Sequence, residues 1–309
     1  MSEASAGRGR AAEGAPILAL REAAGHLVRR AQQRHTSLWS QEFDGALTGP
    51  QYAVISAIGA ECGLDQRAVG QRASLDKSSV GDIIARLEGQ GWLRLAKDPS
   101  DGRRKTLRLT SLARTALPDI TRRVLLVQER LLAPLPSATR EEFVEALRLV
   151  AYAGNPPLPG VAGDQVLALG STPGHLIRRT QQVHTVAWTE EVGRNITAPQ
   201  YAVLSALWAH PDGIDQGTGA DLASLDPSTM ADVVARLVRR GWVLRTKDPA
   251  DARRRLLRLP DGVVGELRQL RPAVERVQDR LLRPLADETT RAGFLHHLGH
   301  LAYADDIRP

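Results

Sequence analysis

The chain has 309 residues, of which 42% are hydrophobic and 25% charged, a composition typical of globular proteins and a length that predicts two domains, each able to bury a core. No apolar run approaches the roughly 18 residues of a membrane span, and the N-terminus lacks the apolar segment of a secretory signal, which excludes these two classes of protein. The 41 lysines and arginines against 35 acidic residues give a charge of +6 that mildly favours an anionic partner. The single cysteine, Cys62, fits a reducing cytoplasm, where we expect the protein to be located.

The sequence repeats itself with a period of about 150 residues, which is too long for a solenoid unit and typical of duplicated domains. The first copy contains GHLVRRAQQRHT at 25–36 and TGPQYAVISA at 48–57, and the second contains GHLIRRTQQVHT at 174–185 and TAPQYAVLSA at 197–206. A segment rich in proline and glycine separates the copies. The predicted division is a disordered tail (1–14), repeat one (15–153), a linker (154–164) and repeat two (165–309).

Each repeat is predicted to begin with two helices. Apolar residues that recur every three or four positions from Leu20 onward indicate a long first helix, and its counterpart in repeat two runs from about Gln165 to Val192. Thr48 is placed to cap the second helix, which has Pro50 in its first turn.

Shorter elements follow. Asp65 begins a short helix that reaches Ala73, and Asp76 is a candidate N-cap for a helix over 77–90. Two short, partly alternating runs flank the turn DPSDGRR at 98–104, which predicts a β-hairpin. Two amphipathic helices end the repeat, at 111–135 and 139–152.

A short helix, a tight turn, a longer helix and a basic hairpin together predict a winged helix-turn-helix, whose second helix enters the major groove of DNA. On helix 77–90 we expect Val80, Ile83, Ile84 and Leu87 to be buried, while hydroxyl and charged residues share the opposite side. Such residues at a helix N-terminus suit contacts with phosphates and bases. The alternative, a solvated face with no DNA role, is disfavoured by the basic hairpin that follows.

Residues 27–117 and 176–267 resemble the MarR (multiple antibiotic resistance regulator) family. The resemblance is most specific in the hairpin, where the family's Asp-x-Arg motif appears as Asp101-Gly102-Arg103 and Asp251-Ala252-Arg253. It implies a fold that is mainly α with small β-hairpin wings, a duplicated winged helix-turn-helix whose first and last helices form a dimerisation region. Because one chain carries both copies, we expect an intramolecular pseudo-dimer, with domain swapping into a larger oligomer as the alternative.

The resemblance further implies a transcriptional regulator, most simply a repressor, whose partner is double-stranded DNA. By the family's pattern, Asp101 and Asp251 orient Arg103 and Arg253 toward a minor groove or its phosphates; an exposed turn without a DNA role is the alternative. The predicted DNA contacts are Lys77, Ser78, Ser79, Asp82, Arg86, Asp101, Arg103, Arg104 and Lys105 in repeat one, and Ser228, Thr229, Asp232, Arg236, Asp251, Arg253, Arg254 and Arg255 in repeat two.

In each repeat, the helix predicted to enter the major groove is its recognition helix, which is helix 77–90 in repeat one. The two recognition helices differ where Lys77 is matched by Pro227 and Ser79 by Thr229. A homodimer must read a palindrome, whereas a fused pair need not. We therefore expect an imperfect palindrome with half-sites about one helical turn apart.

The family commonly responds to small aromatic or phenolic molecules, which bind between the dimerisation helices and the winged domain. The candidates for this pocket are aromatic residues and histidines that both repeats share, because rings with a few polar tips suit an aromatic ligand. They are His35, Trp39 and Tyr52 in repeat one, and His184, Trp188 and Tyr201 in repeat two. The alternative is a histidine satisfied within the core beside packing aromatic residues.

Signals other than an aromatic ligand, and classes of protein other than a regulator, have weaker support. Cys62 is the candidate for redox sensing, and His296, His297 and His300 for metal sensing, although repeat one lacks the histidines. No nucleophile–base set, phosphate-binding loop or paired carboxylates indicate an enzyme, and we expect no cofactor or bound metal. A different alternative is a protein that sequesters a small molecule and has lost DNA binding, which the two basic wings disfavour.

Overall fold

The computed structural model describes residues 18–61, 63–97, 105–156, 165–248, 251 and 253–304. The fold is mainly helical with small antiparallel sheets, as expected from the sequence. Its contacts divide it into two compact units: unit 1 combines residues 1–30 with 182–283, and unit 2 combines 31–181 with 284–309. In the described part of the chain, none of the helices has the length and apolar character required to span a membrane.

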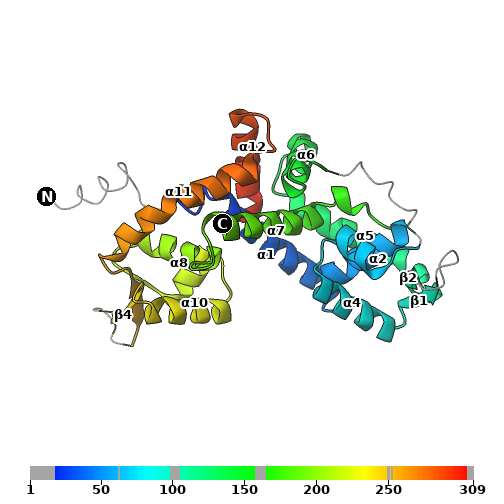
Figure 1. Ribbon diagram of the computed structural model, residues 1–309, viewed down its shortest axis with the longest axis horizontal. Coiled ribbons are helices and arrows are strands. Elements are labelled where there is room, and N and C mark those ends of the chain that lie inside the picture. The colour runs from blue at the N-terminus through cyan, green and yellow to red at the C-terminus, as the bar shows by residue number, and fades with distance from the viewer. Residues whose placement is uncertain are drawn as a thin grey trace. The chain divides into compact units, whose positions relative to one another are not determined.

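Repeat one supplies most of unit 2 (Figure 1). Its first helix begins in unit 1 and continues into unit 2. In chain order its elements are α1 (Ala24–Phe43), α2 (Gly49–Ala60), α3 (Gln66–Ala73), α4 (Lys77–Gly89), β1 (Leu93–Lys97), β2 (Lys105–Leu109), α5 (Ser111–Leu132), the 3-10 turn η1 (Ser137–Thr139) and α6 (Arg140–Ala151).

Repeat two supplies most of unit 1, while its first and last elements contribute to unit 2. Its elements are η2 (Leu169–Ser171), α7 (Pro173–Glu191), α8 (Ala198–Trp208), β3 (Ile214–Asp215), α9 (Gln216–Ala223), α10 (Pro227–Arg239), β4 (Leu244–Lys247), β5 (Arg255–Arg258), α11 (Val263–Leu282) and α12 (Glu288–Ala302). The predicted tail 1–14 and most of the predicted linker, 157–164, lie outside the described residues.

Side-chain caps set the helix starts that the sequence predicted. The Thr48 hydroxyl accepts from the N–H of Gln51, whose side chain bonds back to the Thr48 N–H, a reciprocal box that satisfies two backbone donors. Asp65 caps α3 and Asp76 caps α4 through their carboxylates. Repeat two caps its matching helices in the same way.

The first helix of each repeat starts later than the apolar pattern predicted, at Ala24 and Pro173 instead of Leu20 and Gln165. The chain before α7 is held by side chains of α2: the N–H of Leu167 donates to the Tyr52 hydroxyl, and the Ser56 hydroxyl donates to the Leu167 carbonyl. In unit 1, Leu18 makes the same two bonds with α8. These tertiary bonds outweigh the local helical preference, so the prediction was wrong by several residues at this end.

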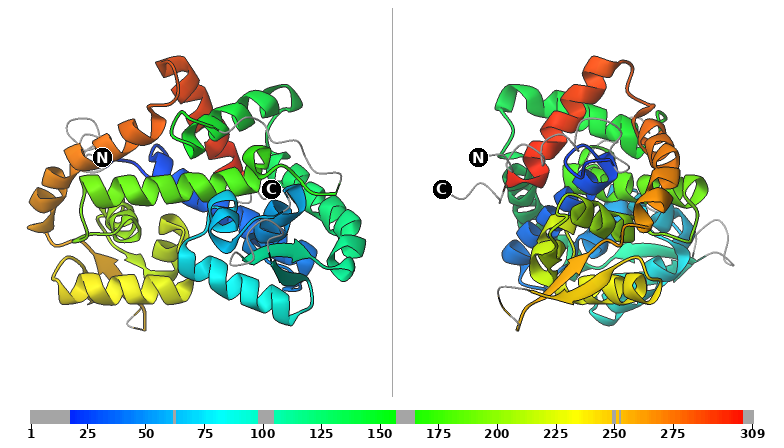
Figure 2. Two further views of the ribbon diagram at one scale, coloured as in Figure 1. Left: turned by 45° about the vertical axis from the view of Figure 1, so that its right-hand side comes forward. Right: turned by 90° about the vertical axis from the view of Figure 1, so that its left-hand side faces the viewer.

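The predicted hairpin is confirmed. In unit 2, β1 and β2 pair antiparallel from Leu93 opposite Leu109 to Lys97 opposite Lys105. In unit 1 the sheet has a third strand that the sequence did not predict, because the two-residue β3 pairs with β5 and gives the order β3-β5-β4. Figure 2 shows this hairpin projecting from the body of unit 1.

The recognition helices bury nearly the face that was predicted. Val80, Ile84 and Leu87 of α4 are buried, whereas Ile83 is only half-buried, at the edge of the apolar stripe. In unit 2 the last helices of the two repeats, α6 and α12, lie side by side (Figures 1 and 2), with the rings of Phe143 and Phe294 stacked at 5.6 Å between centroids.

A histidine ring lies directly against a helical glycine in each unit. In unit 2 the His35 imidazole lies against Gly174 of α7, and in unit 1 the His184 imidazole lies against Gly25 of α1. A methyl group at either glycine would overlap the ring. The contact therefore requires glycine, which has no Cβ and lets another group approach the backbone closely.

We predict that Gly174→Ala destabilises the protein by about 1–3 kcal/mol, the usual cost of overpacking, because the new methyl group must displace the buried His35 ring. The matched control is Gly293→Ala on α12, where a Cβ would meet open space and the better helix former should be neutral or stabilising. Urea unfolding measures both. Equal stabilities for the two variants would show that the glycine–histidine contact tolerates a side chain.

Candidate DNA-binding and effector sites

Each recognition helix begins with a carboxylate that binds two hydroxyl groups. The Asp76 carboxylate accepts from the N–H groups of Ser78 and Ser79 and from both of their hydroxyls, at 2.6–3.0 Å. These hydrogen bonds, led by the Ser79 hydroxyl, hold the pKa of Asp76 far below its usual range. Asp226 binds Ser228 and Thr229 in the same way. The hydroxyls predicted to contact DNA therefore donate their protons within the helix, leaving their oxygens as acceptors.

The charged residues predicted on the recognition helices are exposed. Lys77, Asp82 and Arg86 of α4 are open to solvent, and so are Asp232 and Arg236 of α10. Ser79 and Thr229 are half-buried. The structure thus places the predicted contacts of each helix together on an accessible surface.

The hairpin of unit 1 presents arginines with different partners. Asp251 accepts a hydrogen bond from the backbone N–H of Arg253 at 2.9 Å, so the carboxylate shapes the backbone of the turn. Arg254 forms ion pairs with Asp215 at 2.9 Å and Asp248 at 3.6 Å. Arg253 and Arg255 are exposed, and no side-chain bond joins them to another described residue.

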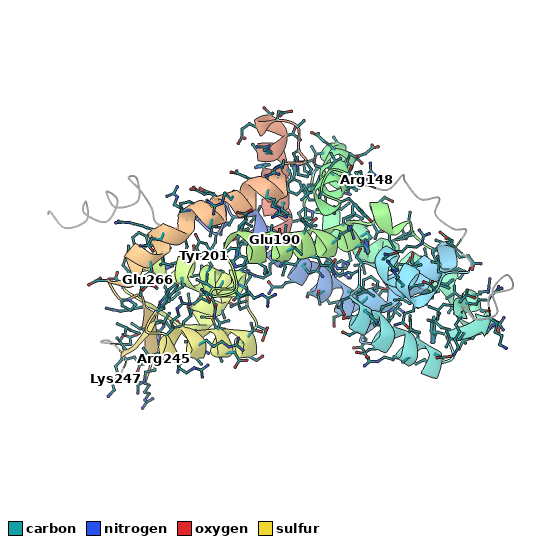
Figure 3. All side chains as sticks on the ribbon, viewed as in Figure 1. Arg148, Glu190, Tyr201, Arg245, Lys247 and Glu266 are labelled. Carbon is teal, nitrogen blue, oxygen red and sulfur yellow. The ribbon has the colours of Figure 1, made fainter. Side chains whose placement is uncertain are left out.

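Further basic side chains extend from the same hairpin. Figure 3 shows Arg245 and Lys247 projecting outward from β4. In repeat one, Asp101, Arg103 and Arg104 lie outside the described residues, and Lys105 is exposed at the start of β2. The geometry of the wing can therefore be followed in unit 1 alone.

Unit 2 contains a cavity of about 290 Å³ whose wall includes all three residues predicted from repeat one. The Trp39 ring lies 5.7 Å from His35 and 5.9 Å from Tyr52, centroid to centroid, and stacks on Phe43 at 4.7 Å. The Trp39 Nε1–H donates to the Leu47 carbonyl at 2.6 Å, which fixes the orientation of the ring. Another hollow in unit 2, of about 330 Å³, has no aromatic ring in its wall.

Polar groups from both repeats reach the cavity. His35 and Gln128 come from repeat one, and His175 and Arg178 from the first helix of repeat two. The Nε2 atoms of His35 and Gln128 are buried without a hydrogen-bond partner among the described residues. Burial, with the Arg178 guanidinium nearby, lowers the pKa of His35 to about 4, so the imidazole is neutral near pH 7.

Arg178 also holds the turn that precedes the recognition helix. Its guanidinium donates to the carbonyl of Ser74 at 2.9 Å and to that of Ala73, and Arg179 donates to the Ser74 hydroxyl at 2.8 Å. Ser74 ends α3 in the left-handed conformation, with φ of 52°. None of the described carboxylates pairs with Arg178, whose pKa burial lowers to about 10.

The same residue types meet in unit 1, but they enclose little space. His184, Trp188 and Tyr201 line a cavity of about 30 Å³ together with Arg29 of repeat one. Arg29 donates to the Ala223 carbonyl at 2.7 Å, and Arg30 to the Ser224 hydroxyl at 3.1 Å. Both predicted aromatic groups are therefore assembled as expected, around cavities of unequal size.

Of the residues weighed for redox and metal sensing, the structure describes only the three histidines. Cys62 lies outside the described residues. His296 and His300 lie on α12 with their Nε2 atoms 3.1 Å apart, while the His297 ring packs edge-on against Phe143. In the described part of the chain, no group of three or more potential ligands could hold a metal ion.

Sequence reasoning missed Arg178, His175, Gln128 and Gly174, which complete the pocket of unit 2. Three of them belong to the repeated motif GHLIRRTQQVHT. The basic pair that both copies keep in this motif was the available signal. The sequence could not show that this helix contributes to the pocket of the other repeat.

Comparisons with known proteins agree on one family. Residues 47–104 and 196–254 each match a family model described as the MarR family. The transcriptional regulator HosA of Escherichia coli O111:H- is 34% identical over 131 residues, which are 42% of this chain and 96% of HosA. The HTH-type transcriptional repressor NicR of Pseudomonas putida is 31% identical over 90 residues, which are 29% of this chain and 57% of NicR.

Among solved structures, the PcaV transcriptional regulator of Streptomyces coelicolor, crystallised with its natural ligand, is 44% identical. The match covers 42% of this chain and 91% of that chain, with a TM-score of 0.39.

The buried histidines predict a loss of stability in mild acid. Burial lowers the pKa of His35 and of His184 to about 4 and that of His26 to about 3, whereas an unfolded histidine titrates near 6.5. Between these values the unfolded chain binds more protons, so the free energy of unfolding falls as the pH drops from about 6.5 to 4. Urea unfolding across this range measures the slope.

The contribution of one histidine is measured with His35→Gln, which should flatten that slope. A free energy of unfolding that is constant between pH 6.5 and 5 would contradict the assignment of neutral buried histidines.

Proposed function

Because the chain belongs to the MarR family of transcriptional regulators, we propose that it is a ligand-released repressor in which one polypeptide supplies both halves of the DNA-binding pseudo-dimer. Regulators of this family bind DNA and are not enzymes. The observation that carries the proposal is the presence, in one chain, of two family matches that each include a capped recognition helix and the start of a basic hairpin.

Two features support the pseudo-dimer. Each unit combines the winged domain of one repeat with the first helical turns of the other. In unit 2 the last helices of both repeats pack together through Phe143 and Phe294, as expected for the dimerisation helices. One chain would then act as a monomeric pseudo-dimer, and exchange of repeats between chains is the alternative.

The proposed DNA contacts are the exposed faces of α4 and α10 for the major groove and the wing arginines for phosphates or a minor groove. Arg253 and Arg255 are the stronger candidates in unit 1, because Arg254 is already paired with two carboxylates. Differences such as Lys77 against Pro227 support an imperfect palindrome, with half-sites about one helical turn apart.

The proposed effector is a small aromatic anion bound in the cavity of unit 2. Aromatic rings form its walls, and a cavity of about 290 Å³ lies near the lower limit for small-molecule sites, which start at about 300 Å³. Arg178 is half-buried and brings a positive charge with no carboxylate partner among the described residues. An anionic group on the ligand would satisfy this charge, since a buried unpaired charge is costly.

Arg178 also suggests how the effector releases DNA. It binds the carbonyls of Ala73 and Ser74, and Asp76, two residues further on, caps the recognition helix. A ligand anion that draws the guanidinium toward itself weakens its hold on this turn. The recognition helix then shifts, and because DNA fixes the spacing of successive major grooves, a small shift lowers affinity.

We predict that Arg253→Ala weakens binding to the operator and lowers the slope of log affinity against log salt by about 1, because one phosphate contact is lost. The control is Arg268→Ala, which removes the same charge from an exposed position on α11. Genome-fragment selection with the full chain supplies the operator, and titration at several salt concentrations gives the slope. Parent-like binding by Arg253→Ala at every salt concentration would show that the wing does not contact DNA.

A chain with no salt-dependent DNA affinity would instead favour the alternative function, sequestration of a small molecule by a protein that has lost DNA binding.

We further predict that Trp39→Ala impairs release from DNA by hydroxybenzoates more than it impairs DNA binding, because Trp39 forms a wall of the cavity. Trp39→Phe, which keeps a ring, should restore most of the response. Matched hydroxybenzamides, which lack the charge, should be weak effectors. Equal loss of ligand response and DNA affinity in Trp39→Ala would identify the residue as part of the core only.

A further inference from the structure

We infer that the chain binds a single effector molecule, in the cavity of unit 2, and that repeat two has closed the matching cavity of unit 1. This inference rests on the proposed effector function and adds its stoichiometry and the residues that decide it. It makes the two halves of the pseudo-dimer unequal in ligand binding as well as in DNA recognition.

The two cavities are built from matching residues and differ in size. His35, Trp39, Tyr52 and Arg178 line the first, and His184, Trp188, Tyr201 and Arg29 line the second. Their volumes are about 290 and 30 Å³. An apolar cavity of about 150 Å³ holds benzene, whereas one near 30 Å³ has room for a water molecule or two. Of these two matching cavities, only that of unit 2 has room for a benzene ring.

The aromatic walls of the two cavities differ by one methyl group. Gly49, the first residue of α2, lines the cavity of unit 2, and its counterpart at the start of α8 is Ala198. A Cβ added at Gly49 would lie 3.9 Å from the Trp39 ring and 4.0 Å from the His35 ring. Ala198 brings such a methyl group to the matching place, so repeat two occupies space that repeat one leaves open.

The loop before this helix also differs. Gly45 lines the cavity of unit 2 in a turn where Asp44 and Gly45 both have positive φ, 46° and 77°. In repeat two the matching residues are Gly193 and Arg194, and only Gly193 has a positive φ, of 87°. The two loops therefore follow different paths, and Arg194 does not line the cavity of unit 1.

A glutamine in the wall of each cavity has both ends of its side-chain amide hydrogen-bonded in unit 1 but not in unit 2. The Gln278 side chain accepts from the N–H of Ala24 at 2.8 Å and donates to the Glu22 carbonyl at 3.1 Å. Gln128, its counterpart, accepts from the N–H of Gly174 at 2.8 Å, but its Nε2 has no partner among the described residues.

The cause of this difference is visible in the sequence. Where repeat one has Ala24, repeat two has Pro173, which carries no N–H, so Gln128 must accept from the next residue along the helix. A buried donor that lacks a partner is costly unless something pairs with it. Gln128 is 6% exposed and lines the cavity, so its amide is placed to bind a ligand oxygen there.

In the wall of the unit 1 cavity, the Nδ1 of His184 also has no hydrogen-bond partner among the described residues. Because the cavity of about 30 Å³ has room for a water, a water molecule is sufficient to satisfy this nitrogen.

Isothermal titration calorimetry tests the inference. The full chain is titrated with the hydroxybenzoate that best releases DNA. We expect one molecule bound per chain. Gly49→Ala should lower the affinity by about tenfold or more, the effect of one methyl group in a tight apolar pocket, without lowering the Tm, since the added Cβ meets no clash. The matched control, Ala198→Ser, adds an atom at the same place in unit 1 and should leave the titration unchanged.

Two molecules bound per chain, or equal weakening by Gly49→Ala and Ala198→Ser, would overturn the single-site inference while leaving the proposed effector class intact. Binding of none of the hydroxybenzoates would overturn the effector class and the inference together. A parent-like affinity in Gly49→Ala would overturn the role given to the missing methyl group.

Discussion

The close contact between a helical glycine and a buried histidine is the constraint on which the effector pocket depends. In unit 2 the His35 ring lies on the backbone of α7 at Gly174, where any side chain would collide with it. Residues four apart lie on the same face of a helix, so this contact also brings Arg178 to the same side. The guanidinium therefore reaches both the cavity and the carbonyls of Ala73 and Ser74. Gly25 and Arg29 repeat the arrangement with His184 in unit 1.

Duplication preserved this arrangement and let its details diverge. Both copies keep the histidine, tryptophan and tyrosine, because these residues also stabilise each unit: Trp39 and Trp188 each donate to a backbone carbonyl eight residues further on. The differences lie in small residues whose change costs little packing, such as Gly49 against Ala198. A homodimer cannot separate its two pockets in this way, since each substitution appears in both.

On the DNA side, the same residues serve the fold and the proposed contact. Asp76 and Asp226 cap the recognition helices and engage the hydroxyls that the sequence offered as DNA contacts. Arg254 is tied to Asp215, which in turn caps α9. Arg254 thus adds an ion pair to the pairing of β3 with β5 that joins the hairpin of unit 1 to its helix-turn-helix, while Arg253 and Arg255 remain exposed.

Much of this protein can be read from its sequence. The duplication, the helix caps at Thr48, Asp65 and Asp76, and the hairpin are local patterns that depend on residues close together in the chain, and the structure confirms them. The aromatic group was also predictable, because His35 and Trp39 are one helical turn apart. The late start of α7 was not, since the bonds from Tyr52 and Ser56 to Leu167 join residues more than a hundred positions apart.

Only the tertiary structure decided which repeat completes which pocket. Arg178 and Gln128 are conspicuous in the sequence only as members of repeated motifs, and no periodicity reveals that α7 of repeat two meets α5 of repeat one within unit 2. The inequality of the two cavities has the same origin. A change from glycine to alanine leaves the local helix almost unaltered, and its effect on a cavity depends on which rings from elsewhere in the chain stand about 4 Å away.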